Sequence, residues 1–249
     1  MDLHERKYEN YLFDNGLEIL LVQDPLIDRD GGSIIIEKGI MDNPLEEGIA
    51  NFAGRLIDFI YFGSFVEVDD KHINLKDLWD YYGDYYVSVE EDFTHYNFDI
   101  LNNGFLKFVY FYSQFLNNLS REKISESLKN YKQEIVKEID EDYNYYKENI
   151  ILREKHLLEY LVYGLKDKEG NDINPEGNNI SISKYEEEDL IKRVADYIED
   201  LIDPKNIKLC FFSKYKLLIT TKSIKKYFNY LLQKKMKLIH QKKIIKNLK

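Results

Sequence analysis

The chain has almost no sulfur chemistry available to it, because Cys210 is its single cysteine among 249 residues. One cysteine cannot form an internal disulfide, and it cannot build a cysteine-based metal site. Cys210 lies in the apolar run Ile207–Phe212, and this setting predicts a buried thiol on a strand rather than a reactive one.

Long apolar runs are also missing. No stretch is long enough to span a bilayer, so the sequence predicts no transmembrane segment. The first ten residues are charged and lack the apolar core of a signal peptide. We therefore expect an intracellular, cytoplasmic location.

Charge is distributed unevenly along the chain. Residues 214–249 hold 12 lysines and no acidic residue, whereas the whole chain has a net charge of −10. We expect an acidic domain over residues 1–232 and a basic tail over 233–249. The tail fits a linker towards a further domain, which we favour, and we expect no nucleic acid as a partner. The alternative is a tail that binds a polyanion or an acidic membrane surface.

Apolar periodicity and turn residues predict a mixture of strands and helices. Asn15-Gly16 predicts a tight turn between two strands, and Ser120 predicts the N-cap of a long helix. The other expected strands are 33–37, 85–100 (a long strand or a hairpin) and 207–212, and the other expected helices are 45–62, 75–82, 104–116, 150–163, 185–202 and 221–232. This order favours an α+β two-layer sandwich, in which helices cover one face of a mixed or antiparallel sheet.

Four segments, in order, resemble motifs of the insulinase/pitrilysin family. They are Asn15–Val22 (Asn-Gly-Leu-x-Val-x-Leu-Val in the family), Gly48–Arg55 (Gly-Leu-Ala-His-Phe-x-Glu-His), Thr94–Asp99 (Thr-x-Tyr-x-Phe) and Glu134–Glu141 (Glu-Val-x-x-Val-x-Ser-Glu). The resemblance extends from about Tyr11 to Leu232. It implies the N-terminal domain of an inverted-motif zinc peptidase, with a fold like that of insulinase and mitochondrial processing peptidase.

The family's chemistry depends on a His-x-x-Glu-His helix. The two histidines lie one turn apart and bind zinc, while the glutamate takes a proton from the zinc-bound water. On this sequence, Asn51 stands at the first histidine, Gly54 at the general base and Arg55 at the second histidine. The resemblance therefore implies that no catalytic residue remains, and we expect no zinc cofactor.

The third zinc ligand in the family is a glutamate from a second helix. The resemblance places Glu141 at this position, with Glu134 at a nearby acidic position. Arg55 then has two alternative interpretations. It can pair with Glu141 across the two helices and so replace the metal's charge, or it can point into solvent while Glu141 is simply exposed.

The resemblance implies a non-catalytic domain that serves as scaffold, peptide-binding or partner domain in a larger peptidase assembly. Its partners would be further insulinase-like domains, in the same or another chain, and peptides. The family lays its substrate along a strand, and the corresponding residues here are Val87, Ser88, Thr94 and Tyr96.

Two alternative functions remain. One is an active zinc endopeptidase with atypical ligands, in which His72 or His95 would approach Glu141. The other is a polyanion-binding module that acts through the basic tail.

Overall fold

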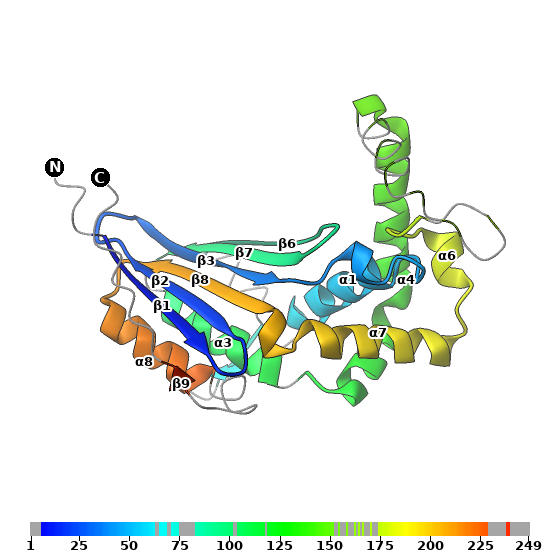
Figure 1. The fold of residues 1–249 in the computed structure, drawn as a ribbon. Helices are drawn as coiled ribbons and strands as arrows, with labels where there is room; N and C mark the ends of the chain where they lie inside the picture. The colour runs from blue at the N-terminus through cyan, green and yellow to red at the C-terminus, as the bar shows by residue number, and fades with distance from the viewer. Residues whose placement is uncertain are drawn as a thin grey trace.

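The structure is a computed structural model of the whole chain (Figure 1). It describes residues 6–62, 65–68, 71–74, 83–101, 104–117, 119–151, 174–228 and 238–239, together with residues 154, 158, 162, 164, 166 and 170. The expected helix 75–82, most of the expected helix 150–163 and the tail 233–249 apart from Leu238–Ile239 lie outside the described residues.

A seven-stranded mixed sheet forms one layer of the fold. Its strands, in spatial order, are β6 (Gly83–Val89), β7 (Thr94–Leu101), β3 (Arg29–Ile36), β8 (Ile207–Ser213), β2 (Glu18–Gln23), β1 (Lys7–Phe13) and β9 (Leu238–Ile239). Strands β2 and β8 run parallel, and the other neighbours are antiparallel. A separate hairpin joins β4 (Phe65–Val68) to β5 (Lys71–Asn74).

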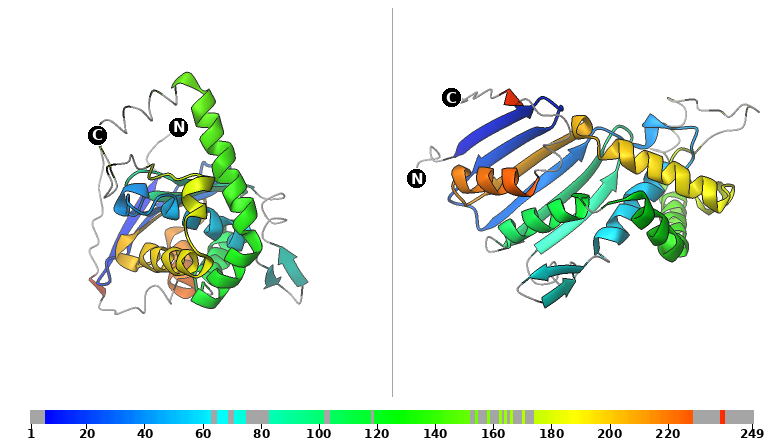
Figure 2. Two further views of the ribbon diagram at one scale, coloured as in Figure 1. Left: turned by 90° about the vertical axis from the view of Figure 1, so that its right-hand side faces the viewer. Right: turned by 90° about the horizontal axis from the view of Figure 1, so that it is seen from below.

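Helices form the second layer. They are α1 (Ile49–Phe62), α3 (Phe105–Asn117), α4 (Arg121–Glu148), α6 (Asn179–Ser183), α7 (Glu187–Leu201) and α8 (Leu217–Tyr227), with short 3-10 turns η2 (Ile40–Asp42) and η3 (Pro204–Asn206). Seen from below, α1, α3, α7 and α8 lie over one face of the sheet (Figure 2). Helix α4 packs against α1 and projects beyond the sheet (Figure 1). Among the described residues, no helix is both long and apolar enough to cross a membrane.

The core lies between the sheet and these helices. Alternate residues of β7, Tyr96, Phe98 and Ile100, are buried on the helix side, as strand geometry requires. The opposite face carries partly exposed side chains such as Leu20 and Phe212. The expected α+β two-layer sandwich is therefore confirmed, and residues 85–100 form the hairpin β6–β7 rather than one long strand.

The predicted turn at Asn15-Gly16 and the predicted N-cap at Ser120 are both confirmed. Gly16 has a φ of +89°, which favours glycine, and Asn15 Oδ1 accepts a hydrogen bond from Leu17 N. Ser120 Oγ accepts a hydrogen bond from Lys123 N and begins α4.

Several element boundaries differ from those expected. Strand β3 begins at Arg29 and runs through Gly31 and Gly32. Aromatic rings of β8 and β7 cover the space where side chains at positions 31 and 32 would lie, so glycine fits at both positions. Helix α1 begins at Ile49 rather than residue 45. Helix α8 (Leu217–Tyr227) begins before residue 221, and residues 229–232 of the expected helix lie outside the described residues. Cys210 is half-buried on the outer face of β8, and burial raises the pKa of its thiol.

Candidate functional site

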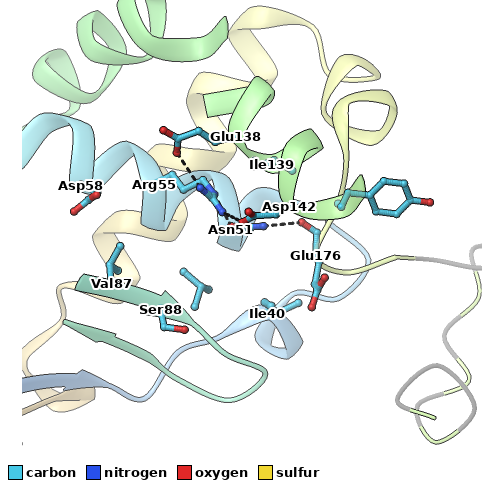
Figure 3. A pocket seen from close by; sticks show the side chains of 13 residues that line it. Ile40, Asn51, Arg55, Asp58, Val87, Ser88, Glu138, Ile139, Asp142 and Glu176 are labelled. Atoms are coloured by element: carbon cyan, nitrogen blue, oxygen red, sulfur yellow. Dashed lines mark hydrogen bonds and ion pairs between the residues drawn. The ribbon is translucent and has the colours of Figure 1, made fainter. Parts of the chain in front are cut away.

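One face of α1 borders a pocket of about 210 Å³ (Figure 3). Asn51, Arg55 and Asp58 follow one another at helical spacing and place their side chains on this face. Strand β6, helix α4 and the loop before α6 form the other walls. The lining residues are Ile40, Asn51, Arg55, Asp58, Val87, Ser88, Val89, Glu138, Ile139, Asp142, Tyr143, Glu176 and Gly177.

The guanidinium of Arg55 joins α1 to α4 across the pocket. Its Nη1 lies 2.9 Å from Glu138 Oε2, and its Nη2 contacts Asp142 Oδ2. Its Nε donates a hydrogen bond of 3.1 Å to Asn51 Oδ1. All three nitrogens therefore have partners, and the side chain is only 22% exposed. The interpretation that Arg55 points into solvent is wrong.

The other alternative, a pairing of Arg55 with Glu141, is also wrong, whereas the exposure of Glu141 that accompanied the solvent interpretation is confirmed. Glu141 is 64% exposed and lies 3.4 Å from Lys137 on its own helix. Glu134 is exposed as well. At about 100° per residue, Glu141 lies roughly 200° around α4 from the buried Ile139, so its side chain points away from α1.

Glu138 and Asp142 were not predicted from the sequence as partners of Arg55. The family motif points instead to Glu134 and Glu141, which lie on a different face of α4. The buried residues Ile135 and Ile139 mark the face of α4 that meets the core. Glu138 and Asp142 each follow one of these residues by three positions, so that they lie beside this face. The apolar stripe was therefore the signal that could have found them.

Asn51 holds the loop before α6 against α1. Its Nδ2 donates a hydrogen bond of 3.3 Å to the backbone oxygen of Glu176. Nearby, Gly48 N donates to Pro175 O at 3.0 Å, and a Cβ on Gly177 would overlap Gly48. The amide of Asn51 thus joins the loop to Arg55, and the loop closes one side of the pocket.

Gly54 lies where α1 packs against β6. A Cβ at this position would overlap Cγ2 of Val89, the last residue of β6. The space that a longer side chain at position 54 would need is therefore filled by Val89. A glutamate cannot be placed there unless Val89 or the helix moves.

Asp58 is the carboxyl group of the pocket whose pKa is clearly raised. Burial, and secondarily the nearby charge of Glu138, raise its pKa to about 7, while Arg55 opposes the shift. Its Oδ1 is buried and has no hydrogen-bond partner among the described residues.

Three tyrosines lie close to Asp58, namely Tyr85 on β6, Tyr96 on β7 and Tyr112 on α3. Asp58 raises the pKa of Tyr85, Tyr96 and Tyr112, although burial is the larger cause for each of them. The presence of an aspartate in the apolar run of α1 was the sequence signal for this site, and it was missed.

The residues of the pocket do not fit the zinc ion that the resemblance implies. A guanidinium cannot coordinate a metal, and both atoms of the Asn51 amide already have partners. Within the described ranges, no three His, Cys, Asp or Glu side chains are arranged to hold a metal ion.

The histidines proposed as atypical ligands gain no support from the geometry. The ring of His95 contacts the rings of Tyr86 and Phe93, with centroids 5.9 and 5.4 Å away. It alternates with the buried residues of β7, so it lies on the face of the sheet opposite the helices. The side chain of His72 lies outside the described residues.

The expected peptide-binding residues divide between two strands. Val87 and Ser88 lie on β6, which is bonded only to β7 among the described strands. Thr94 and Tyr96 are buried on β7, which is bonded on both sides, so they cannot pair with a peptide. That part of the expectation is wrong.

Comparison with solved structures agrees with the observed fold. Pitrilysin has 16% identity and a TM-score of 0.71, with 95% of this chain and 24% of that chain covered. A protease from Helicobacter pylori has 14% identity and a TM-score of 0.63, with 96% and 52% covered. The periplasmic protease PqqL from Escherichia coli has 14% identity and a TM-score of 0.62, with 95% and 25% covered.

The chain therefore spans about a quarter of pitrilysin and PqqL and about half of the Helicobacter protease. No family model matches the sequence, and no curated protein does. At these identities the likeness concerns the fold alone. The chain has the fold of an insulinase-like domain of pitrilysin-type proteases.

Proposed function

We propose that this chain is a non-catalytic insulinase-like domain that binds extended peptide segments and belongs to a larger peptidase assembly. It would act there as scaffold and peptide-binding wall, beside further insulinase-like domains in the same or another chain. We propose that it needs no zinc.

The contact between Gly54 and Val89 is the observation that carries the proposal. In the family that the sequence resembles, position 54 supplies the general base. Here a side chain at that position would overlap Val89 Cγ2. Arg55 supports the same conclusion, because it places a fixed positive charge, held by two carboxylates, where a ligand histidine would stand.

The position of β6 at the edge of the sheet, among the described strands, supports peptide binding. Glu90 N donates to Phe93 O at 2.8 Å at the end of the β6–β7 hairpin. Because hydrogen-bonded and non-bonded pairs alternate in an antiparallel ladder, the backbone N–H and C=O of Val87 and Val89 then point away from β7. These groups can pair with a peptide that adds to the sheet as a further strand.

The partial coverage of the neighbours, about a quarter of pitrilysin and PqqL and about half of the Helicobacter protease, supports a role in an assembly. Pitrilysin is about four times as long as the matched region, so the same fold occurs there within a larger protein. Within the described ranges, the chain provides the pocket and the outer edge of β6, but no three His, Cys, Asp or Glu side chains arranged to hold a metal ion.

A substitution on the strand edge tests peptide binding directly. Val87→Pro removes the outward N–H, and proline is tolerated on an edge strand when its nitrogen faces away from the sheet. Val87→Ala keeps that N–H and serves as the matched control. Binding of labelled, extended eight-residue peptides is measured by fluorescence anisotropy, and peptide integrity is checked by mass spectrometry.

We expect the unmodified chain and Val87→Ala to bind peptides without cutting them, and Val87→Pro to lose at least about tenfold in affinity, which is about 1.4 kcal/mol. Equal binding by Val87→Pro, with an unchanged thermal unfolding curve, would show that β6 is not the binding edge. Zinc-dependent cleavage by the unmodified chain would overturn the non-catalytic proposal.

A further inference from the structure

We propose that the exposed face of α8 docks the chain on an anionic lipid surface. Its lysines would lie among the headgroups, and Leu218 and Ile219 would insert beneath them. Helix α8 packs against α3, β1 and β2, and β1 and β2 lie towards the other edge of the sheet from β6. The inference therefore concerns a separate surface and goes beyond the proposed binding of peptides.

Helix α8 has two distinct faces. Thr220 and Ile224 are buried and mark the face that meets the core. At about 100° per residue, the exposed residues fall within an arc of roughly 120° on the opposite side. These residues, which we call the outer strip, are Leu218, Ile219, Lys222, Lys225 and Lys226. One strip of the helix surface therefore combines apolar and basic side chains.

The apolar part of the outer strip lies in the first turn of α8. Leu218 is 64% exposed and Ile219 is 42% exposed. Water gains nothing from contact with these side chains, whereas insertion at the boundary between headgroups and acyl chains would bury them. The aliphatic stems of the neighbouring lysines can enter the same boundary while their ammonium groups stay at the headgroups.

The basic part of the outer strip is not neutralised by carboxylates. Within the described residues, Lys222, Lys225 and Lys226 form no ion pair. Lys225 Nζ lies 5.5 Å from the ring centroid of Tyr11, and Lys226 Nζ lies 5.2 Å from that of Tyr227. Residues 214–249 hold 12 lysines and no acidic residue. This positive charge complements a surface of anionic lipid headgroups.

The acidic residues of the chain do not oppose this docking, because many of them lie elsewhere. Helix α7 begins with Glu187, Glu188 and Asp189, and α4 is also rich in acidic residues. Both helices lie at the opposite end of the fold from α8, as Figures 1 and 2 show. The asymmetry would turn α8 towards a negative surface although the net charge of the chain is −10.

The outer strip favours a lipid surface over a nucleic acid. Lysines alone can neutralise the phosphates of either partner. Leu218 and Ile219, however, offer neither a hydrogen-bond donor for phosphate nor an aromatic ring on which a base could stack. An anionic membrane uses both parts of the strip, because it presents negative headgroups above an apolar layer.

Co-sedimentation of the full chain with lipid vesicles tests the inference. Vesicles of phosphatidylcholine alone are compared with vesicles that contain about 30% phosphatidylserine, at about 0.15 M salt. We expect at least about tenfold tighter binding to the vesicles that contain phosphatidylserine, and weaker binding as the salt is raised. Equal binding to both vesicles, or binding to neither, would overturn the inference.

Replacement of the exposed apolar pair tests insertion. Leu218→Ser/Ile219→Ser should weaken binding to phosphatidylserine vesicles about tenfold or more. Ile150→Ser/Ile151→Ser is the matched control, because these side chains are 71% and 76% exposed just beyond the end of α4. The control should bind within about twofold of the unmodified chain. Unchanged binding by Leu218→Ser/Ile219→Ser would overturn the inference and indicate recognition of phosphate charge alone.

Replacement of the lysines tests the charge of the strip. The triple variant Lys222→Gln/Lys225→Gln/Lys226→Gln should lose about tenfold or more in affinity for phosphatidylserine vesicles. The same loss of charge on α4 should change binding by less than about threefold, and its matched control carries Lys129→Gln, Lys137→Gln and Lys147→Gln.

Thermal unfolding curves confirm that each variant is folded, since all the replaced side chains are exposed. Equal losses in the α8 and α4 triple variants would overturn the inference, because they would show an effect of net charge alone. Tighter binding of a single-stranded oligonucleotide than of phosphatidylserine vesicles, unaffected by Leu218→Ser/Ile219→Ser, would overturn it in favour of a nucleic acid.

Discussion

Cγ2 of Val89 occupies the space into which the Cβ of any residue larger than Gly54 would project. Helix α1 therefore rests directly on the edge strand β6 at this point. The contact explains why a glycine, which is an unfavourable residue in the middle of a helix, stands at position 54. It also removes the room that a catalytic glutamate would need.

Gly54→Ala tests this contact. At an unconstrained helix position, the substitution would stabilise the fold by about 0.5 to 1 kcal/mol. Here we expect it to lower the free energy of unfolding by about 1 to 3 kcal/mol, because it forces Val89 or α1 to move. Urea unfolding measures the change.

The double variant Gly54→Ala/Val89→Ala provides the control. Each single variant should be destabilised, whereas the pair should be more stable than the sum of the two effects by about 1 kcal/mol or more. Additive effects, or a Gly54→Ala chain more stable than the unmodified one, would show that Val89 does not fill this space.

The bridge from Arg55 to α4 gives a second prediction. Arg55→Met leaves Glu138 and Asp142 without their cation, and these carboxylates are 44% and 53% exposed, so water screens part of the loss. We expect a destabilisation of about 1 to 2 kcal/mol. Lys137→Met, which breaks only the exposed pair with Glu141, should cost less than about 0.5 kcal/mol.

Double-mutant cycles identify the partner of Arg55. The effects of Arg55→Met and Glu138→Gln should not add, because the two residues share one contact. The effects of Arg55→Met and Glu141→Gln should add within about 0.5 kcal/mol. A coupling energy between Arg55 and Glu141, without one to Glu138, would contradict the observed register of α4.

Asp58 gives the chain a predictable dependence on pH. Its pKa is raised from 3.8 to about 7, so the folded chain keeps a proton that the unfolded chain has released. The stabilising contribution of the neutral carboxyl is fully present below about pH 4 and is lost as the pH rises through 7. Between about pH 4 and 7, burial of the ionised carboxylate therefore lowers the free energy of unfolding more and more as the pH rises.

Asp58→Asn imitates the protonated carboxyl and should remove this cost. We expect the variant to be more stable than the unmodified chain by about 2 to 4 kcal/mol at pH 8, and equally stable within about 0.5 kcal/mol at pH 4. Asp84→Asn, the same change at a side chain that is 90% exposed, is the matched control. A pH-independent difference for Asp58→Asn would mean that Asp58 ionises as an ordinary surface carboxylate.

Local chemistry accounts for the parts of the fold that the sequence predicted well. The turn at Asn15-Gly16 depends on residues that tolerate a positive φ, and the start of α4 depends on the Ser120 side chain. The sheet and its helix layer followed from apolar periodicity, because one face of each element must be buried. In such places, a few neighbouring residues determine the structure.

The site was predicted less completely, because it depends on how two distant elements meet. An acidic residue occurs at several angular positions of α4, so a motif alone did not show whether Glu141 or Glu138 faces α1. The closeness of Gly54 and Val89, far apart in sequence, follows from the packing of α1 on β6. Thr94 and Tyr96 were assigned to an edge because strand order is not written in the strand's own sequence.

The most direct test of the non-catalytic proposal is the zinc content of the purified chain. Elemental analysis is done on protein prepared without added metal, and again after loading with zinc and dialysis. With Arg55 held by Glu138 and Asp142, and with Gly54 packed on Val89, we expect far less than one zinc per chain in both samples. About one zinc per chain that resists dialysis would contradict the account.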